Sequence, residues 1–301
     1  MKRIFFSVIL LFLSCLTLLA QEQNEQEMIN REIFDRVYEI VSQEQDLPMP
    51  QLVTLIAQQF LETEYVASTL EQTPEQLRVF LDKTDCILFV ELCSSFALTV
   101  KGLRIEQAGD GRRYTLRSKP SVSQAQPSYE LLCDNIRNMR YRLGIVDGYA
   151  SRIHYTSEWI LQNQTNGILR EYTRELGEEY PQDFYFMSSH PKQYFQLAED
   201  STQLAKIREV ELHLAAQKPY YFISQEQLLK PEVIDEIQSG DIVCFMSKQG
   251  NGIDIAHVAI AFEVDGEMHF IHASYGAKKV KVEERTLAEY AKNGIRILRF
   301  R

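Results

Sequence analysis

The chain has 301 residues, with 45% hydrophobic and 25% charged residues and a formal net charge of −10. This length and hydrophobic content are enough to bury a full core, which excludes a disordered segment or a fibrous repeat. Acidic residues outnumber basic ones by 42 to 32, and no basic stripe is concentrated enough to follow a phosphate backbone, so a nucleic-acid partner is not expected.

The N-terminus has the pattern of a secretory signal peptide. Lys2 and Arg3 precede an apolar stretch that ends at Ala20, and the sequence then turns abruptly polar. We expect cleavage of residues 1–20, which leaves an acidic protein exported to the periplasm or cell envelope of a bacterium. The alternative is that this segment stays uncleaved as a membrane anchor, but about 17 apolar residues are at the short limit for a membrane span. After cleavage, no stable membrane span is expected.

Helices are predicted for the first part of the mature chain. Apolar residues recur three and four positions apart in two stretches, which are separated by a turn at Pro48 and Pro50. They form a predicted helical extension over residues 21–76. A further helix follows the polar residues 82–85, and since residues 86–93 are almost wholly apolar, this helix is expected to be buried.

The pattern then changes from helices to strands. Residues 105–128 are polar and rich in turn formers, which predicts a surface loop, and helical periodicity returns over residues 131–143. The stretch 149–222 mixes helix and loop. Short apolar runs typical of antiparallel strands follow at residues 241–245, 257–264, 268–273 and 280–282. Helices first and a sheet last indicate an α+β domain.

One predicted hairpin brings two histidines together. Asp265-Gly266 lies between two apolar runs and is a strong signal for a two-residue turn, which fixes the register of the two strands. In this register His257 lies opposite Ser274, with His272 as its diagonal neighbour on the same face of the sheet. A four-residue loop gives the same result, whereas a three-residue loop reverses it. His269 falls on the other face.

Cys86 is the candidate nucleophile. Thr84 or Asp85 is a suitable N-cap, which places Cys86 in the first helical turn, where unpaired amides and the helix dipole favour a thiolate and can hold an oxyanion. The imidazole of His257 would lower the thiol pKa further and later donate its proton to a leaving amine, and His272 would orient and polarise that imidazole. Taken alone, each residue has a plainer interpretation as a core cysteine or a structural histidine. Their conjunction favours the triad.

Four cysteines remain after the predicted cleavage, namely Cys86, Cys93, Cys133 and Cys244. Three disulfide pairings are open to them. An exported protein can form disulfides, but a chain with this much apolar content does not require them. Cys93, about two helical turns after Cys86, and Cys244, in an apolar strand, are expected to be core residues.

Several sequence segments point to a known family. Asp85-Cys86, 240–243, 257–260 and 270–274 occur in the order typical of the NlpC-type superfamily of papain-like cell-wall cysteine peptidases and amidases. The chain resembles more closely the N-acetylmuramoyl-L-alanine amidase-like branch, at residues 65–71, 85–91, 151–155, 159 and 186–191. The similarity runs from about residue 55 to the C-terminus. Leu88, where the branch usually has a small hydroxyl residue, and Glu64, where proline is common, are departures that bear on the shape of the pocket.

The resemblance implies a papain-like, NlpC-type α+β fold in which the helical N-terminal part, with the nucleophile helix, packs on the C-terminal antiparallel sheet. Residues 21–301 would form one catalytic domain, with a large insertion between Cys86 and His257. The implied reaction is cleavage of the amide between N-acetylmuramic acid, or its anhydro form, and L-alanine of a muropeptide. The triad of Cys86, His257 and His272 would carry it without a metal or other cofactor.

The large insertion would form the wall of the cleft and bind sugar and peptide. The candidate substrate-binding residues are Tyr65, Arg152, His154, Tyr155, Trp159 and Ser274. An arginine can bind a carboxylate through two hydrogen bonds, and aromatic faces can stack on sugars. Each has the alternative of a packed aromatic side chain or an ion pair. His190 is a weaker candidate, and Glu91 is expected to be a buried carboxylate bonded to a neighbour.

Three other functions stay open. A stem-peptide endopeptidase that cuts after D-glutamate would keep the same triad. A non-catalytic cell-wall-binding protein would keep the fold without turnover. A zinc hydrolase would use Cys86, His257 and His272 as ligands, although no closely spaced Cys/His motif supports it. The oligomeric state is not indicated by the sequence.

Overall fold

Two helices open the chain in the computed structural model, which describes residues 2–106 and 121–301 and, within them, the side chains of 21–106 and 123–301. Helix α1 spans Lys2–Val41, and after a short 3-10 turn, η1 (Ser42–Glu44), helix α2 spans Met49–Gln59. Pro48 is the N-cap of α2 and Pro50 lies in its first turn, where a missing N–H costs no hydrogen bond. Both predicted helices and the turn between them are confirmed.

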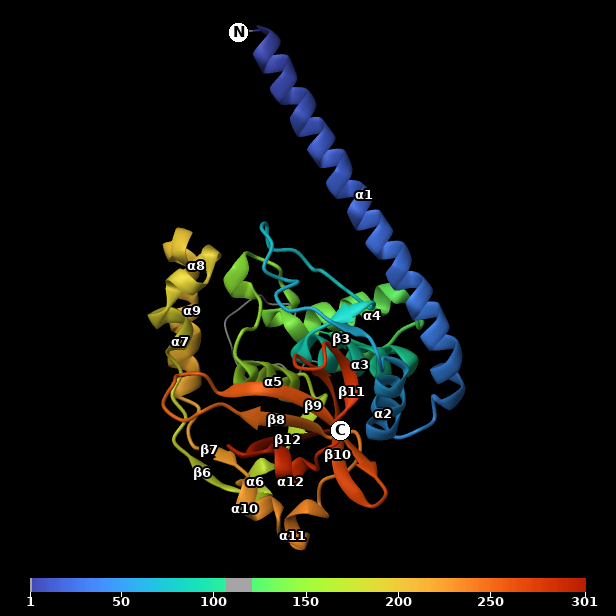
Figure 1. Cartoon of the computed structure of the whole chain (residues 1–301), viewed down its shortest axis with the longest axis vertical. Coiled ribbons are helices and arrows are strands. Elements are labelled where there is room, and N and C mark those ends of the chain that lie inside the picture. Colours follow the sequence, from blue (N-terminus) through green and yellow to red (C-terminus); the bar gives the residue numbers. More distant parts are fainter. Residues whose placement is uncertain (1, 107–120) are drawn as a thin grey trace.

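The N-terminal half of α1 projects beyond the rest of the molecule as a rod (Figure 1). Most of the predicted signal peptide forms this projecting half, and its cleavage stays a prediction. Among the described residues, no helix is both long enough and apolar enough to cross a membrane.

The predicted helical extension over residues 21–76 is too long. The helices end at Gln59, because Glu62 and Ser68 adopt positive φ angles that no α-helix contains. Strand β1 (Glu64–Tyr65) follows instead and belongs to the main sheet.

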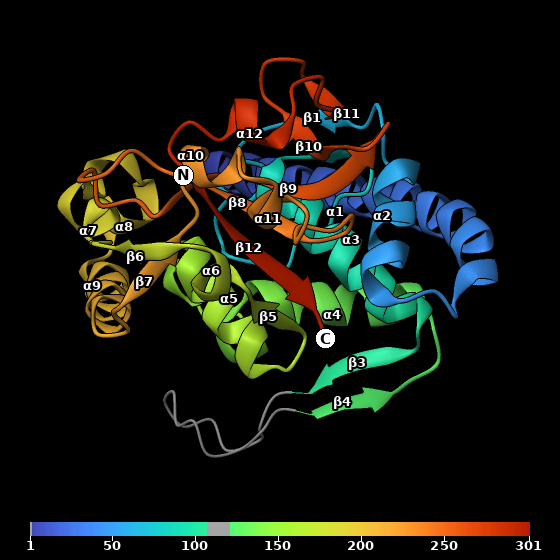
Figure 2. The same cartoon turned by 90° about the horizontal axis from the view of Figure 1, so that it is seen from below.

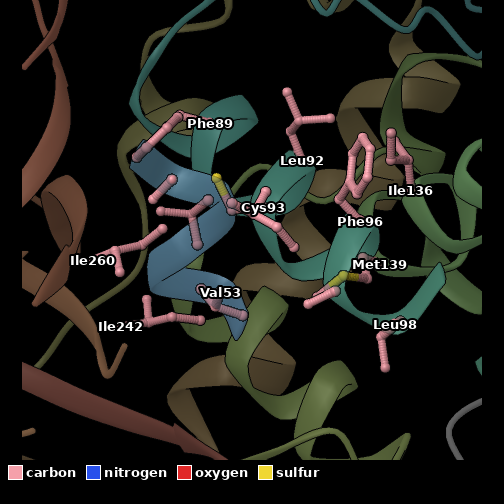
Figure 3. Close-up of a cluster of buried hydrophobic side chains, with 14 of the residues drawn as sticks. Val53, Phe89, Leu92, Cys93, Phe96, Leu98, Ile136, Met139, Ile242 and Ile260 are labelled. Carbon is pink, nitrogen blue, oxygen red and sulfur yellow. The ribbon is translucent and has the colours of Figure 1, made fainter. Parts of the chain in front are cut away.

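Helix α3 (Cys86–Val100) runs through the hydrophobic core. The Asp85 side chain caps its N-terminus by accepting a hydrogen bond of 3.0 Å from the N–H of Leu88, so Asp85 rather than Thr84 is the N-cap. Nearly every side chain of α3 is buried, as its largely apolar sequence predicts. Figure 3 shows Cys93 and Phe96 of this helix packed among apolar side chains from other elements.

Eight strands of the described residues form the main sheet, in the order β2-β1-β11-β10-β9-β8-β12-β5. Besides β1, they are β2 (Lys83–Thr84), β5 (Leu169–Glu171), β8 (Ile242–Met246), β9 (Ile255–Val264), β10 (Glu267–Ser274), β11 (Lys279–Val282) and β12 (Ile295–Phe300). The β1–β2 pair is parallel and the other pairs are antiparallel. This arrangement confirms the α+β class and the four predicted C-terminal strands, while the narrower papain-like assignment stays a prediction.

The predicted register of the β9–β10 hairpin is confirmed. Glu267 pairs with Val264 and His269 with Phe262, as a two-residue turn requires. Asp265 and Gly266 have φ angles of 54° and 85°, the left-handed values that a type I′ turn needs at both central positions.

The remaining elements surround this sheet. Helix α4 (Tyr129–Arg140) confirms the predicted helical periodicity. Within the predicted surface loop over residues 105–128, β3 (Leu103–Glu106) and β4 (Ser121–Gln124) pair as a small ribbon (Figure 2), and residues 107–120 lie outside the described residues. The other elements are η2 (Arg142–Gly144), η3 (Tyr149–Ser151), α5 (Thr156–Thr165), α6 (Thr173–Leu176), β6 (Glu178–Tyr180), α7 (Phe186–Ser189), η4 (Pro191–Gln193), α8 (Phe195–Glu199), α9 (Ser201–Ala215), β7 (Tyr220–Phe222), α10 (Gln225–Leu228), α11 (Pro231–Ile234) and α12 (Leu287–Tyr290).

Candidate active site

Cys86 lies where the start of α3 meets strand β9. Its sulfur accepts a hydrogen bond from the backbone N–H of Val258, the residue that follows His257. The N–H groups of Cys86 itself and of Ile87 also interact favourably with the sulfur. The two elements that carry the predicted nucleophile and base are therefore in direct contact.

The Cys86 thiol is protonated at neutral pH. Burial, assisted by the neighbouring Asp85 carboxylate, raises its pKa to about 12, and the three N–H groups oppose this only in part. The expectation that the helix start would favour a resting thiolate is therefore wrong, because burial outweighs the helix dipole. A base has to remove the proton when the sulfur reacts.

His257 and His272 are joined by a hydrogen bond. Nε2 of His257 lies 2.7 Å from Nδ1 of His272, and the two rings are close to perpendicular. This contact confirms the predicted shared sheet face. His257 is partly exposed, whereas His272 is buried between Phe270 and Tyr290. Among the described residues, Nδ1 of His257 has no hydrogen-bond partner.

A buried carboxylate lies on the far side of His272. Oε2 of Glu283 is 3.4 Å from Nε2 of His272, and Oε1 accepts a 2.7 Å hydrogen bond from Nε of Arg285. The sequence analysis missed Glu283. The register of β10 and β11 indicates its position. Lys281 pairs with His272, and Glu283 lies two residues after Lys281, so its side chain is on the same face of the sheet.

Both histidines are neutral at neutral pH. Burial, followed by the charge that a protonated His272 would carry, lowers the pKa of His257 to about 3. Burial likewise lowers the pKa of His272 to about 4, and Glu283 acts against the shift at both residues. Burial tends to raise the pKa of Glu283, but its contacts with Arg285 and Lys281 hold that pKa below its usual value. The network thus contains two neutral imidazoles and one carboxylate.

Of the candidate substrate-binding residues, Tyr65 lies near Cys86, and Ser274 lies on the strand that carries His272. Tyr65 pairs with Thr84 in the β1–β2 ladder, and burial together with the charge of Cys86 raises the pKa of its phenol to about 12. Ser274 lies on β10, two residues after His272, and its Oγ accepts a hydrogen bond of 3.2 Å from the N–H of Ala277. The sequence analysis missed Tyr275, which is 68% exposed and packs edge-on against Tyr65.

Arg152 and His154 are engaged in contacts within the protein. The Arg152 guanidinium is buried and forms ion pairs with Glu71 at 2.9 Å and with Glu75 at 3.2 Å. His154 contacts the backbone oxygen of Tyr149 through Nε2 at 2.9 Å, and burial followed by the charge of Arg152 lowers its pKa. Both side chains are thus occupied by contacts within the protein, which is the alternative to substrate binding given for them above.

Tyr155 and Trp159 are core residues in the structure, with 3% and 2% of their surface exposed. The Tyr155 hydroxyl donates to Glu211 at 2.7 Å and accepts from the N–H of Met187. Side chains buried to this degree present no surface to a substrate, so their positions correspond to packing roles.

Three further expectations concern residues outside the triad. Glu91 is buried and accepts a 2.7 Å hydrogen bond from Nε of Arg140, which confirms its structural role. His190 is exposed and stacks on Phe186. The thiols of Cys86, Cys93, Cys133 and Cys244 are all free. Within residues 2–106 and 121–301, no three His, Cys, Asp or Glu side chains are grouped so that they could hold a metal ion.

Comparison with known proteins gives one family and several similar structures. The family described as N-acetylmuramoyl-L-alanine amidase-like matches residues 55–296 of the chain. No curated protein matches the chain. A crystal structure of an N-acetylmuramoyl-L-alanine amidase from Bacteroides uniformis is 30% identical, with a TM-score of 0.71 over 84% of this chain and 99% of that one.

Two other structures extend the comparison. A Bacteroides fragilis protein named provisionally as a xylanase is 28% identical, with a TM-score of 0.67 over 81% of this chain and 98% of that one. A Legionella pneumophila protein is 18% identical, with a TM-score of 0.62 over 91% of this chain and 96% of that one. At that identity the last comparison shows a shared fold alone.

Proposed function

The chain belongs to the N-acetylmuramoyl-L-alanine amidase-like family, and we propose that it is a cysteine amidase that releases the stem peptide from N-acetylmuramic acid or its anhydro form. The observation that carries this proposal is the contact of the Cys86 sulfur with the residue after His257, combined with the 2.7 Å hydrogen bond between His257 and His272. These contacts support a triad in which Cys86 is the nucleophile, His257 is the base and His272 orients the base.

The reaction begins with proton transfer and attack. Nδ1 of His257 accepts the proton of the Cys86 thiol, and the sulfur attacks the lactyl carbonyl carbon to form a tetrahedral intermediate. The carbonyl electron pair moves to oxygen, where the N–H group of Cys86 at the start of α3 can hold the negative charge. The next three N–H groups of this turn are engaged with Asp85, since those of Ile87 and Leu88 interact with its carboxylate and that of Phe89 donates to its backbone oxygen.

The intermediate then collapses in two stages. The bond from carbon to nitrogen breaks, His257 donates its proton to the departing amine of L-alanine, and the lactyl group remains on sulfur as a thioester. Water, deprotonated by His257, attacks the thioester, and the thiol leaves with the proton that His257 returns. Cys86 and His257 thus end in their starting protonation states.

Substrate contacts are proposed for the residues beside the nucleophile. Tyr65 pairs with Thr84 just before α3 and packs against Tyr275, the residue after Ser274 at the end of β10, and the exposed ring of Tyr275 offers a face on which a sugar can stack. We retain Tyr65 and Ser274 from the sequence analysis and add Tyr275. Arg152, His154, Tyr155 and Trp159 are better described as supports of the wall than as contacts.

Cell-wall fragments are the proposed partner, and export is the proposed route to them. The signal-peptide pattern of residues 1–20 supports secretion to the periplasm or envelope. N-terminal sequencing of the protein purified from its native host tests this point, and a mature chain that starts at Gln21 is expected. A chain that still starts at Met1 would contradict cleavage.

Product analysis on defined muropeptides tests the reaction. Mass spectrometry should show intact stem peptide released from reduced or anhydro muropeptide. Release of an L-alanyl-D-glutamate dipeptide would instead support the endopeptidase, and binding without turnover would support a wall-binding protein. Activity that resists alkylation of thiols but is lost with a chelator would support a zinc hydrolase.

A further inference from the structure

We infer that Glu283 is a positioning residue that fixes the proton positions on both histidines of the triad. This inference rests on the proposed function, because it concerns how His257 is held ready to act as a base. The side chains of His257, His272 and Glu283 follow one another through contacts of 2.7 and 3.4 Å, and the Cys86 sulfur lies beside the backbone of the residue after His257.

The contacts among these side chains determine which nitrogen carries each proton. An ionised carboxylate can only accept hydrogen bonds, so the Glu283 oxygen that lies 3.4 Å from Nε2 of His272 calls for a proton on that nitrogen. A neutral imidazole carries one proton, so Nδ1 of His272 must then be an acceptor. It lies 2.7 Å from Nε2 of His257, which must therefore be the donor. The remaining nitrogen of His257, Nδ1, is left unprotonated and able to accept the thiol proton.

The surroundings of Glu283 keep it ionised. Arg285 donates to one oxygen at 2.7 Å, and Lys281 lies 3.9 Å from the other. The Arg285 guanidinium also lies over the ring of Tyr290 at 4.5 Å, and Tyr290 in turn packs against both histidines. The charged and titratable groups that face His272 from the neighbouring elements are thus Glu283, Lys281, Arg285, Tyr290 and His257.

A carboxylate at this position also assists the reaction itself. When His257 takes the thiol proton, positive charge develops on the histidine pair in a buried setting. Glu283 is the negative group that raises the pKa of both histidines, so it stabilises this charge where it forms. The predicted triad is therefore a chain of four residues.

Nitrogen-15 NMR of histidine side chains tests the inference without relying on turnover. In the wild-type protein we expect both histidines to be neutral and protonated on Nε2, with signals assigned by His257→Gln and His272→Gln. A wild-type His257 that is protonated on Nδ1 would overturn the inference, whatever any variant does.

Variants give the second arm of the test. Glu283→Gln presents an amide that can donate to Nε2 of His272, and we expect it to populate the reversed tautomers and to lower kcat about 100-fold with little change in KM. Glu283→Asp should restore the wild-type tautomer and part of the rate. Glu284→Gln is the matched control, because Glu284 is the next residue and its side chain is 92% exposed.

The outcomes separate the two proposals. If Glu283→Gln keeps wild-type tautomers and kinetics, Glu283 is not a positioning residue, even when the wild-type enzyme releases stem peptide as proposed. If the tautomers are as expected but the wild-type enzyme does not release stem peptide, the proposed function fails and the positioning role stands.

Discussion

The sulfur of Cys86 is hydrogen-bonded to the backbone N–H of Val258, next in sequence to His257. Because the donor is a backbone group of a paired strand, the register of β8 and β9 holds the donor in place. The start of α3 is thereby fixed against the strand that carries the base. The two elements that carry the proposed nucleophile and base are thus in contact in the absence of substrate.

Replacement of Cys86 should abolish turnover. Cys86→Ala removes the sulfur that forms the proposed thioester, so we expect release of stem peptide to fall by at least about 1,000-fold while muropeptide binding persists. Mass spectrometry of the products and calorimetric titration measure the two effects. Cys133→Ser, at another free thiol, serves as the control and should keep its activity. Equal turnover by Cys86→Ala and wild-type protein would rule out covalent catalysis at this residue.

Replacement of the two histidines of β10 should have very different effects on turnover. His272→Ala removes the acceptor for Nε2 of His257, and we expect kcat to fall about 100-fold with little change in KM. His269 lies on the other face of the strand, where Nδ1 contacts the backbone oxygens of Glu283 and Arg285 and Nε2 lies 4.0 Å from the Glu267 carboxylate, so His269→Gln should remain near the wild-type rate. Steady-state kinetics on a purified muropeptide compare them. A larger loss at His269 than at His272 would contradict the proposed triad.

Asp85 should control the reactivity of the thiol. Asp85→Asn keeps an N-cap of similar strength but removes a negative charge that raises the pKa of Cys86. We expect alkylation of Cys86 by iodoacetamide to titrate at lower pH in this variant. Mass spectrometry of the labelled protein across pH measures the shift, and Asp82→Asn, three residues earlier and outside the cap, is the control. An unchanged profile for Asp85→Asn would show that its carboxylate does not act on the sulfur.

Stability should fall as the pH is lowered below about 6.5. An unfolded histidine has a pKa near 6.5, whereas that of folded His257 is about 3, so between these values the unfolded chain binds a proton that the folded chain does not. Each such group lowers the free energy of unfolding by about 1.4 kcal/mol per pH unit. His257→Gln should make this slope shallower by about that amount in urea titrations from pH 7.5 to 4.5. Parallel curves for variant and wild type would contradict the buried, neutral state of His257.

The buried pair of Glu91 and Arg140 should be more important for stability than any surface pair. Glu91→Gln leaves the Arg140 charge buried without its partner, which should lower the free energy of unfolding by about 3–5 kcal/mol. The double variant Glu91→Leu/Arg140→Met removes both charges and should lose less. Glu27→Gln, which breaks an exposed pair with Arg31, should change stability by less than about 1 kcal/mol. Denaturant titration distinguishes these cases, and a single variant as stable as wild type would contradict the prediction.

Local patterns were sufficient to predict much of the fold. The turn at Asp265-Gly266 fixed the β9–β10 register, and the apolar run after Asp85 predicted a buried helix with Cys86 in its first turn. Strands β5 and β12 were missed. Their pairing joins segments more than a hundred residues apart, and no short-range signal marks such a contact.

Contacts within the candidate site were predictable where one hairpin contains both partners. The contact of His257 with His272 follows from pleat alternation, but that of His272 with Glu283 requires the register of a third strand. The burial of Arg152, Tyr155 and Trp159 could not be inferred, because an aromatic or basic residue in a loop-rich stretch looks the same whether it lines a cleft or supports it. The thiol pKa was misjudged for a related reason, since burial depends on what packs over the helix start.

Strand β12 follows every other strand along the chain and yet lies inside the sheet, between β8 and β5. This interior strand is therefore synthesised after all its neighbours. Until β12 pairs with β8, one edge of β8 is unpaired, and its other edge pairs with β9, the strand that carries His257. Such an edge is a hazard for aggregation, so slow translation near Ile295–Phe300, or loss of these residues, should make the newly made protein dependent on chaperones.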